Sequence, residues 1–200
     1  MKLKREEIVT GMIELLGEEK VVTQKDILKE SSLDRFRRFE GHHGVYNQPF
    51  PAAVVYVENS DEVSQVLQYA NEHQINVIPR TGQSATEGGL ESVVEDSIVL
   101  DGSRMDAIVS IDTYNMQATV QCGVPLQKLD DLLREKGFTT GHSPQSKPLA
   151  QLGGLTATRS IGQLSTLYGG IEDMVVGLEA VFPNGEITRI KNVPRRAAGP

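Results

Sequence analysis

The sequence contains a single cysteine, Cys122, no tryptophan and no long apolar run among its 200 residues. One cysteine excludes an internal disulfide and a zinc site built from several thiolates. A membrane-spanning helix needs roughly 20 apolar residues, and the first residues also lack the apolar stretch of a secretory signal peptide. We therefore expect a cytoplasmic protein without a transmembrane segment.

Positive charge is also scarce. The 20 Lys and Arg are outnumbered by 27 Asp and Glu, which gives a formal net charge of −7. An acidic chain without a basic stripe argues against nucleic acid as the main partner. Between Phe39 and Asp101 the only Lys or Arg is Arg80. A basic run precedes this stretch at residues 34–39, where a solvated turn with packed aromatics is a more common explanation than an anion site.

Metal-ligating patterns are equally weak. His42 and His43 are adjacent, so on an extended segment they would point to opposite faces and make a poor chelating pair. We predict no metal site. With 38% hydrophobic and 24% charged residues, the chain has the composition of a globular domain.

The periodicity of apolar residues predicts an α+β fold. A helical N-terminal arm over residues 1–48 precedes a larger domain over residues 49–200. The predicted helices lie near residues 8–16, 24–31, 60–73 and 125–136, and the predicted strands near residues 53–57, 75–79, 97–100, 107–111, 116–121, 174–182 and 186–190. The strand, helix, strand unit over residues 53–79 favours parallel strands, and the Asn184-Gly185 pair favours a hairpin.

Small side chains dominate the segment Pro79–Gly89, which follows a predicted strand. Such a loop allows neighbouring backbone amides to surround an anion, and the hydroxyls of Ser84 or Thr86 can add donors. The segment matches neither the P-loop pattern nor the G-x-G-x-x-G dinucleotide pattern. An ordinary glycine-rich connection remains an alternative explanation.

A second segment of this kind covers residues 141–162, which are rich in glycine, serine and proline. It is too polar for a core element and too long for a routine connection, so a binding loop is expected. His142 within it is more often structural than catalytic. Arg159 is a candidate for a charge-assisted contact with an anion, or for an ordinary surface salt bridge. Two such loops suggest an extended ligand that contains phosphate.

In order and spacing these segments resemble FAD-linked oxidases of the vanillyl-alcohol oxidase and p-cresol methylhydroxylase type. The resemblance also uses Gln121–Val124, Tyr168–Asp173 and the Pro183–Gly185 turn, and it covers Ala52 to Pro200. Alkyldihydroxyacetone-phosphate synthase and its bacterial FAD-linked relatives are most similar, and glycolate oxidase and D-lactate dehydrogenase flavin subunits less so. The resemblance implies two α+β subdomains that hold FAD between them and a separate substrate domain.

The resemblance also implies which residues contact the cofactor. The first loop would surround the FAD pyrophosphate through its amides, and the second would contact the remaining pyrophosphate, the ribityl chain and the flavin. The implied cofactor-binding residues are Pro79, Arg80, Thr81, Gly82, Gln83, Ser84, Ala85, Pro144, Gln145, Ser146, Lys147, Pro148, Leu149, Ala150, Gly153, Gly154, Thr158, Arg159, Ser160 and Ile161. Family members that attach FAD covalently carry a histidine in the first loop, where this chain has Gln83, or a cysteine in the second loop, which has none. We therefore predict non-covalent FAD.

The resemblance predicts the N-terminal, FAD-binding part of a flavin-dependent oxidoreductase. The reaction would be oxidation of a hydroxy acid or other alcohol, or chemistry like that of alkylglycerone-phosphate synthase. The small-molecule substrate and the catalytic residues would belong to a C-terminal portion, and Val193–Pro200 resembles a family segment that further FAD-contacting residues normally follow. A homo-oligomer is expected. The alternatives are a non-catalytic FAD- or nucleotide-binding module, a subunit that completes a partner chain, and an α+β protein that does not bind FAD.

Overall fold

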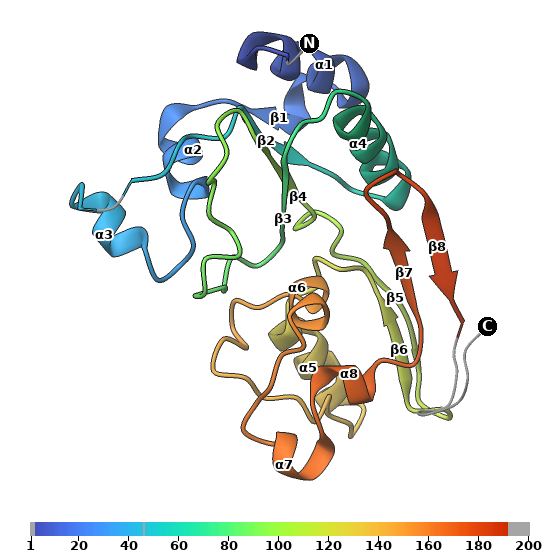
Figure 1. Cartoon of the computed structure of the whole chain (residues 1–200). Helices are drawn as coiled ribbons and strands as arrows, with labels where there is room; N and C mark the ends of the chain where they lie inside the picture. Colours follow the sequence, from blue (N-terminus) through green and yellow to red (C-terminus); the bar gives the residue numbers. More distant parts are fainter. Residues whose placement is uncertain (1–2, 46, 192–200) are drawn as a thin grey trace. The chain divides into compact units, whose positions relative to one another are not determined.

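The computed structural model describes residues 3–45 and 47–191, and Figure 1 shows the arrangement of its elements. The chain forms two compact units. The first runs to Arg104 and includes Val181–Ile187, and the second comprises Met105–Ala180 and continues from Thr188. No helix within the described residues is long and apolar enough to cross a membrane. The segment Val193–Pro200 lies outside the described residues.

The first unit contains all the helices that its sequence predicts. Its elements in chain order are α1 (Arg5–Leu16), η1 (Glu18–Lys20), β1 (Val21–Val22), α2 (Lys25–Ser31), α3 (Arg38–His42), β2 (Ala53–Tyr56), α4 (Ser60–Glu72), β3 (Val77–Arg80) and β4 (Ile98–Asp101). Gly17 ends α1 with a φ of +93°, a value that few other residues adopt. Asn59 caps α4, because its side chain accepts a hydrogen bond of 2.9 Å from the amide of Glu62.

The sheet of the first unit has the strand order β1-β2-β4-β3. Both β2 and β3 pair with β4 in parallel, and β1 pairs with β2 antiparallel. The predicted parallel orientation of strands 53–57 and 75–79 is therefore correct, although β4 separates the two strands. All four residues of β4 are buried, as expected for a strand covered on both faces.

The core of the first unit lies on this sheet. Leu28 of α2 packs with Val54, Ile78 and Val99 from the three parallel strands. Val66 and Ala70 are the buried residues of α4. The loop that follows Arg80 leaves the sheet at the carboxyl ends of its parallel strands. In open sheets with parallel strands, ligands bind beyond these carboxyl ends.

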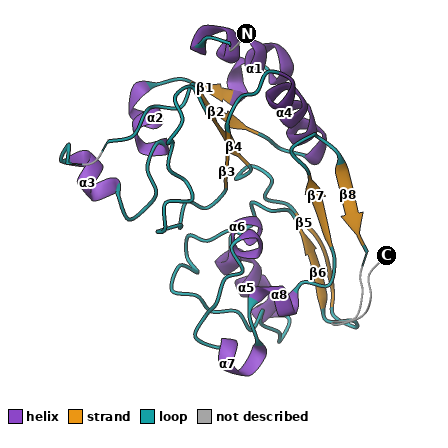
Figure 2. Cartoon of the chain, viewed as in Figure 1, coloured by secondary structure: helices purple, strands orange, loops and turns teal. Residues whose placement is uncertain are grey.

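The second unit consists of antiparallel strands and short helices (Figure 2). Its elements are β5 (Ile108–Asp112), β6 (Gln117–Val120), α5 (Leu126–Glu135), α6 (Leu152–Ala157), α7 (Ser165–Tyr168) and α8 (Ile171–Met174), followed by the hairpin of β7 (Leu178–Val181) and β8 (Ile187–Ile190), whose residues belong to both units. As predicted, β5 pairs antiparallel with β6 and the second hairpin turns at Gly185. The buried cluster of the second unit consists of Leu126, Ala150, Leu155 and Ile171.

The second polar segment differs from its prediction. Residues 152–157 form the helix α6, and Ala150 and Leu155 are buried in the core. The short helix is possible because Gly153 has no side chain and its amide donates to the carbonyl oxygen of Cys122 at 2.8 Å. Only the parts of this segment on either side of α6 are loops.

The basic run at residues 34–39 also differs. Phe36 is 64% exposed, so the prediction that the aromatics of this run pack on the body is wrong for Phe36. Asp34, in contrast, is buried, and the run continues into α3. His42 accordingly lies in a helix rather than on an extended segment.

Candidate functional site

The backbone of the first loop has amides available for a ligand. Within the part of the chain that the structure describes, no amide of Thr81–Ala85 donates a hydrogen bond to another residue. Gln83 lies in the middle of this stretch with a φ of +51°. A left-handed residue among right-handed or extended neighbours turns successive amides toward one point, which is the geometry of a main-chain anion site. The loop can therefore bind an anion without a charged side chain.

Contacts with an earlier segment hold this loop in place. The amide of Arg35 donates to the carbonyl oxygen of Ala85 at 3.0 Å. The buried carboxylate of Asp34 accepts hydrogen bonds from the amides of Gly88 at 2.5 Å and Arg37 at 3.1 Å. Residues that precede the first parallel strand thus fix the loop at two points after its left-handed residue, Gln83.

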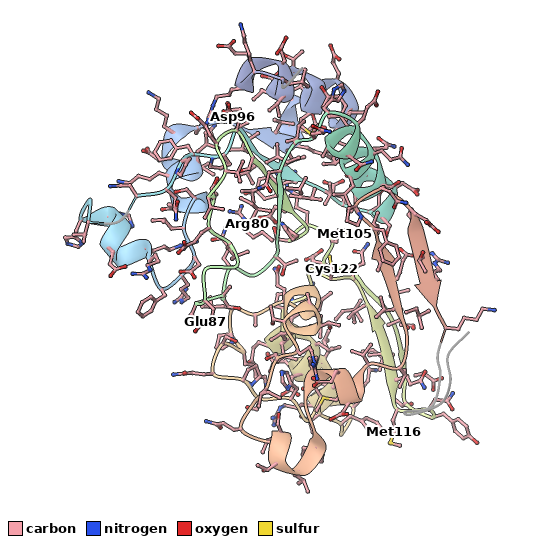
Figure 3. The ribbon with its side chains drawn as sticks, in the orientation of Figure 1. Arg80, Glu87, Asp96, Met105, Met116 and Cys122 are labelled. Carbon is pink, nitrogen blue, oxygen red and sulfur yellow. The ribbon has the colours of Figure 1, made fainter. Side chains whose placement is uncertain are left out.

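Arg80 does not offer its charge to a ligand. Its guanidinium is buried, with Nε donating to Asp101 Oδ2 at 2.6 Å and Nη1 donating to Ser31 Oγ at 2.7 Å. Figure 3 shows Arg80 within the unit and Glu87 at the outer end of the loop. The side chain that the sequence marked as the local cation therefore holds β3, β4 and α2 together. Arg80 thus leaves the backbone amides as the loop's own donors for an anion.

The second segment begins with a compact turn at Pro144–Ala150. The amide of Lys147 donates to the carbonyl oxygen of Pro144 at 3.0 Å, and the amides of Leu149 and Ala150 donate to that of Ser146 at 2.8 Å. The amides of Gln145 and Ser146 donate to none of the described residues. Most amides of this turn are used within it, so fewer remain for a ligand than in the first loop.

Lys147 holds the turn against α5. Its Nζ lies 2.6 Å from Oδ2 of Asp130, whose side chain is fully buried. The same carboxylate accepts hydrogen bonds from Arg134 at 2.7 Å and from Thr139 at 2.7 Å. Burial alone would raise the pKa of Asp130, but the hydrogen bonds from Lys147 and Arg134 hold that pKa well below its usual range. Asp130 is therefore ionised, and Lys147 contributes to the position of the turn.

Two buried polar atoms of the second unit have no partner among the described residues. They are His142 Nδ1 and Gln151 Oε1. The other ring nitrogen of His142, Nε2, lies 3.1 Å from Ser160 Oγ. Burial lowers the pKa of His142, and the nearby Glu172 offsets this only in part, so the ring is neutral near pH 7. Buried polar atoms are normally paired, so these two atoms fit a ligand that supplies polar groups, as FAD does.

The residues after α6 make mainly local contacts. Thr158 Oγ1 donates to the carbonyl oxygen of Gly154 at 2.9 Å. Arg159 has a φ of +52° and forms a salt bridge of 3.1 Å with Glu172, and its side chain is 76% exposed. The structure thus shows the surface salt bridge that was one of the two sequence-based explanations of Arg159. The amide of Ile161 donates to no residue in the described part of the chain.

The structure places Pro79–Ala85 on the first unit and Pro144–Ile161 on the second. Two residues that the sequence did not single out lie within or contact these sets. Gln151 lies inside the second segment, but an amide side chain there carries no distinctive signal. Arg38 contacts Gln83, and the only sequence signal for it was the basic run at residues 34–39.

Known proteins share the sequence pattern and the fold of this chain. Residues 51–191 match the family described as FAD binding domain. The FAD-linked oxidoreductase YgcU of Escherichia coli K12 is 64% identical over 200 residues, which are all of this chain and 41% of that protein. A solved alkyldihydroxyacetonephosphate synthase superposes with a TM-score of 0.85 at 26% identity, covering 95% of this chain and 39% of that one.

The fold type is likewise shared with p-cresol methylhydroxylase. Its solved structure superposes with a TM-score of 0.70 at 22% identity, covering 92% of this chain and 35% of that one. The predicted fold class and the predicted FAD cofactor are confirmed by these matches. The individual cofactor-binding residues stay predictions. The chain spans about 41% of the length of YgcU, and it belongs to the FAD binding domain family.

Proposed function

We propose that this chain is the FAD-binding part of a flavin-dependent oxidoreductase. The observation that carries the proposal is the row of free amides at Thr81–Ala85 around the left-handed Gln83, because FAD contains a pyrophosphate that such a site accepts. Bound flavin supplies hydride-transfer chemistry that no protein side chain provides. The chain's own residues bind and orient the cofactor.

The two units contribute differently to cofactor binding in this proposal. The first loop donates backbone hydrogen bonds to the pyrophosphate. The second unit offers the amides of Gln145, Ser146 and Ile161 together with His142 Nδ1 and Gln151 Oε1, none of which has a hydrogen-bond partner among the described residues. These groups suit the hydroxyls, carbonyls and ring nitrogens of the rest of FAD. Lys147 and Arg80 act indirectly, because Asp130 and Asp101 engage their charges.

The FAD is held without a covalent bond. Gln83, at the position where covalent family members carry histidine, has an amide side chain that is not a nucleophile. Cys122 lies outside both loops, half-buried, with its Sγ 3.8 Å from Sδ of Met105. The first loop therefore has no histidine, and the second segment no cysteine, for the two attachments that the covalent family members use.

The substrate is a small molecule, either a hydroxy acid or other alcohol or an alkylglycerone phosphate. The name of one similar protein, an alkyldihydroxyacetonephosphate synthase, supports the second class, and the name of the other, an FAD-linked oxidoreductase, supports an oxidation. Because this chain spans about 41% of YgcU, we assign the catalytic residues to the remainder of the whole protein. A cytoplasmic location and a homo-oligomeric state stay predictions from the sequence.

The binding test uses ADP and adenosine as competitors of FAD, because these two compounds differ only in the pyrophosphate. We expect the chain to bind FAD and to retain it through gel filtration, with ADP competing for the site and adenosine competing far less. Acid precipitation is expected to leave the flavin in the supernatant. Absence of FAD binding, or equal competition by adenosine and ADP, would contradict the proposed pyrophosphate site. Flavin that stays with the precipitated protein would contradict non-covalent binding.

A further inference from the structure

The first loop lacks a free cation of its own. Arg80 is the only Lys or Arg between Phe39 and Asp101, and its guanidinium is buried against Asp101. A pyrophosphate carries formal charge, and backbone amides alone offer only dipoles. A charged side chain from elsewhere in the first unit would therefore strengthen the site.

Arg38 of α3 brings such a charge to the loop. Its Nη2 donates a hydrogen bond to Oε1 of Gln83, the left-handed residue among the free amides. Its Nε is buried, and no residue in the described part of the chain accepts a hydrogen bond from it. A buried guanidinium N–H without an acceptor is costly, and a phosphate oxygen is a strong acceptor for it.

No carboxylate neutralises Arg38 within residues 3–45 and 47–191. The neighbouring Arg37 forms a salt bridge of 2.8 Å with Glu40. Asp34 is near in sequence, but its carboxylate accepts from the amides of Gly88 and Arg37. The positive charge of Arg38 is therefore available to an anion at the loop.

The position of Arg38 is also well determined by its own segment. Asp34 and Arg35 make backbone contacts with the loop at Gly88 and Ala85. Both contacts lie shortly after Gln83 in the loop, so they hold the segment that carries Arg38 beside the loop. The basic run at residues 34–39, for which a solvated turn was the more common explanation, thus has one member that contacts the candidate anion site.

We propose that Arg38 is a pyrophosphate-binding residue, contributed from outside the matched residues 51–191. The guanidinium donates to a pyrophosphate oxygen through its free N–H, while its bond to Gln83 keeps the loop in the binding conformation. This inference rests on the proposed function, since it assumes that the first loop holds the pyrophosphate of FAD.

The test separates the charge of Arg38 from its bond to Gln83. Arg38→Gln keeps an N–H donor for Gln83 but removes the charge, whereas Arg38→Lys keeps the charge. By titration of the 200-residue chain, Arg38→Gln should weaken FAD and ADP binding by roughly tenfold to hundredfold. Arg38→Lys should restore most of the affinity, and FAD binding to Arg38→Gln should depend less on salt.

Arg35→Gln is the matched control, because Arg35 has the same charge, lies on the same segment and has an exposed side chain, and the variant keeps the backbone amide that donates to Ala85. It should change FAD affinity by less than about twofold. Unchanged FAD binding in Arg38→Gln would overturn the role of Arg38 and leave the proposed function standing. Equal losses in Arg38→Gln and Arg38→Lys would show that the loop needs the shape of the guanidinium beside Gln83 and not its charge, and would overturn the proposed contact with pyrophosphate. A wild-type chain that binds no FAD would overturn both proposals.

Discussion

At the residue scale, Asp130 shows how one buried carboxylate joins separate parts of the second unit. It accepts hydrogen bonds from Arg134 on its own helix, from Lys147 in the second segment and from Thr139 and Thr140 after the helix. Its pKa lies below the usual range despite burial, because these donors stabilise the ionised form. The carboxylate therefore favours the folded state whenever it is ionised.

We expect Asp130→Asn to lower the free energy of unfolding by about 3 kcal/mol at pH 7, because Lys147 loses its buried partner. The folded-state pKa is depressed, so the contribution is complete above the unfolded pKa of about 3.9 and is lost as the pH falls below it. Urea unfolding at pH 7 and pH 3 measures this. The difference between wild type and variant should shrink at pH 3.

Asp131→Asn provides the comparison for this experiment. Asp131 is the next residue, is exposed and accepts a hydrogen bond of 2.7 Å from Gln127. Its substitution should change the unfolding free energy by no more than about 0.5 kcal/mol. If Asp130→Asn cost the same at pH 7 and pH 3, its effect would come from packing and not from charge.

The sequence predicts residue types at the site better than it predicts their partners. Arg80 was identified as the one cation of its stretch, yet the register of β3 and β4 places it beside Asp101 and away from a ligand. Arg38 contacts a residue 45 positions away. Such pairings depend on the tertiary fold, and local sequence patterns do not contain them.

At the element scale, the two loops differ in how well the sequence describes them. The first was predictable, because small residues follow a strand and leave its amides free. In the second, Gly153 and Gly154 lower the helix propensity of residues 152–157, so the sequence suggests a loop. Packing against the backbone of Cys122 stabilises α6 in spite of that propensity.

Gly153→Ala tests that packing. In an isolated helix, alanine would be favoured over glycine by about 1 kcal/mol. Here a Cβ at residue 153 would lie 2.6 Å from Cβ of Cys122 and 3.2 Å from its backbone. We therefore expect the unfolding free energy to fall by about 1–3 kcal/mol, measured by urea unfolding without FAD.

Gly89→Ala is the control, because a Cβ there meets nothing within 4 Å. It should be close to neutral in the same measurement. A stabilised Gly153→Ala protein would show that helix propensity, and not the approach to Cys122, determines the stability of α6.

In the sheet of the first unit, the sequence predicts the strands but not their order. Each parallel strand of the first unit is a short apolar run that the sequence marks clearly. The insertion of β4 between β2 and β3 is not marked, because strand order follows from long-range contacts. The two-residue β1 is also too short to have a periodic pattern.

At the scale of the whole molecule, the predicted cofactor links binding to stability. A ligand that binds only the folded chain adds about 2.7 kcal/mol to the free energy of unfolding at a free concentration of 100 times its dissociation constant. We expect FAD to raise the urea midpoint of this chain in that way as its concentration increases. Adenosine at equal concentration should have a much smaller effect, and a midpoint independent of FAD would favour the α+β protein that does not bind it.

Asp34 and Arg35 contact the first loop, so the structural unit that holds this loop begins earlier in the chain than the matched family does. The matched family begins at residue 51, but β1 pairs with β2, Leu28 fills the core under the sheet, and Ser31 holds Arg80. A transplant of residues 51–191 into another protein would carry the first loop without the residues that shape it. In this chain, a segment that keeps these contacts begins no later than Val21, well before the matched residues.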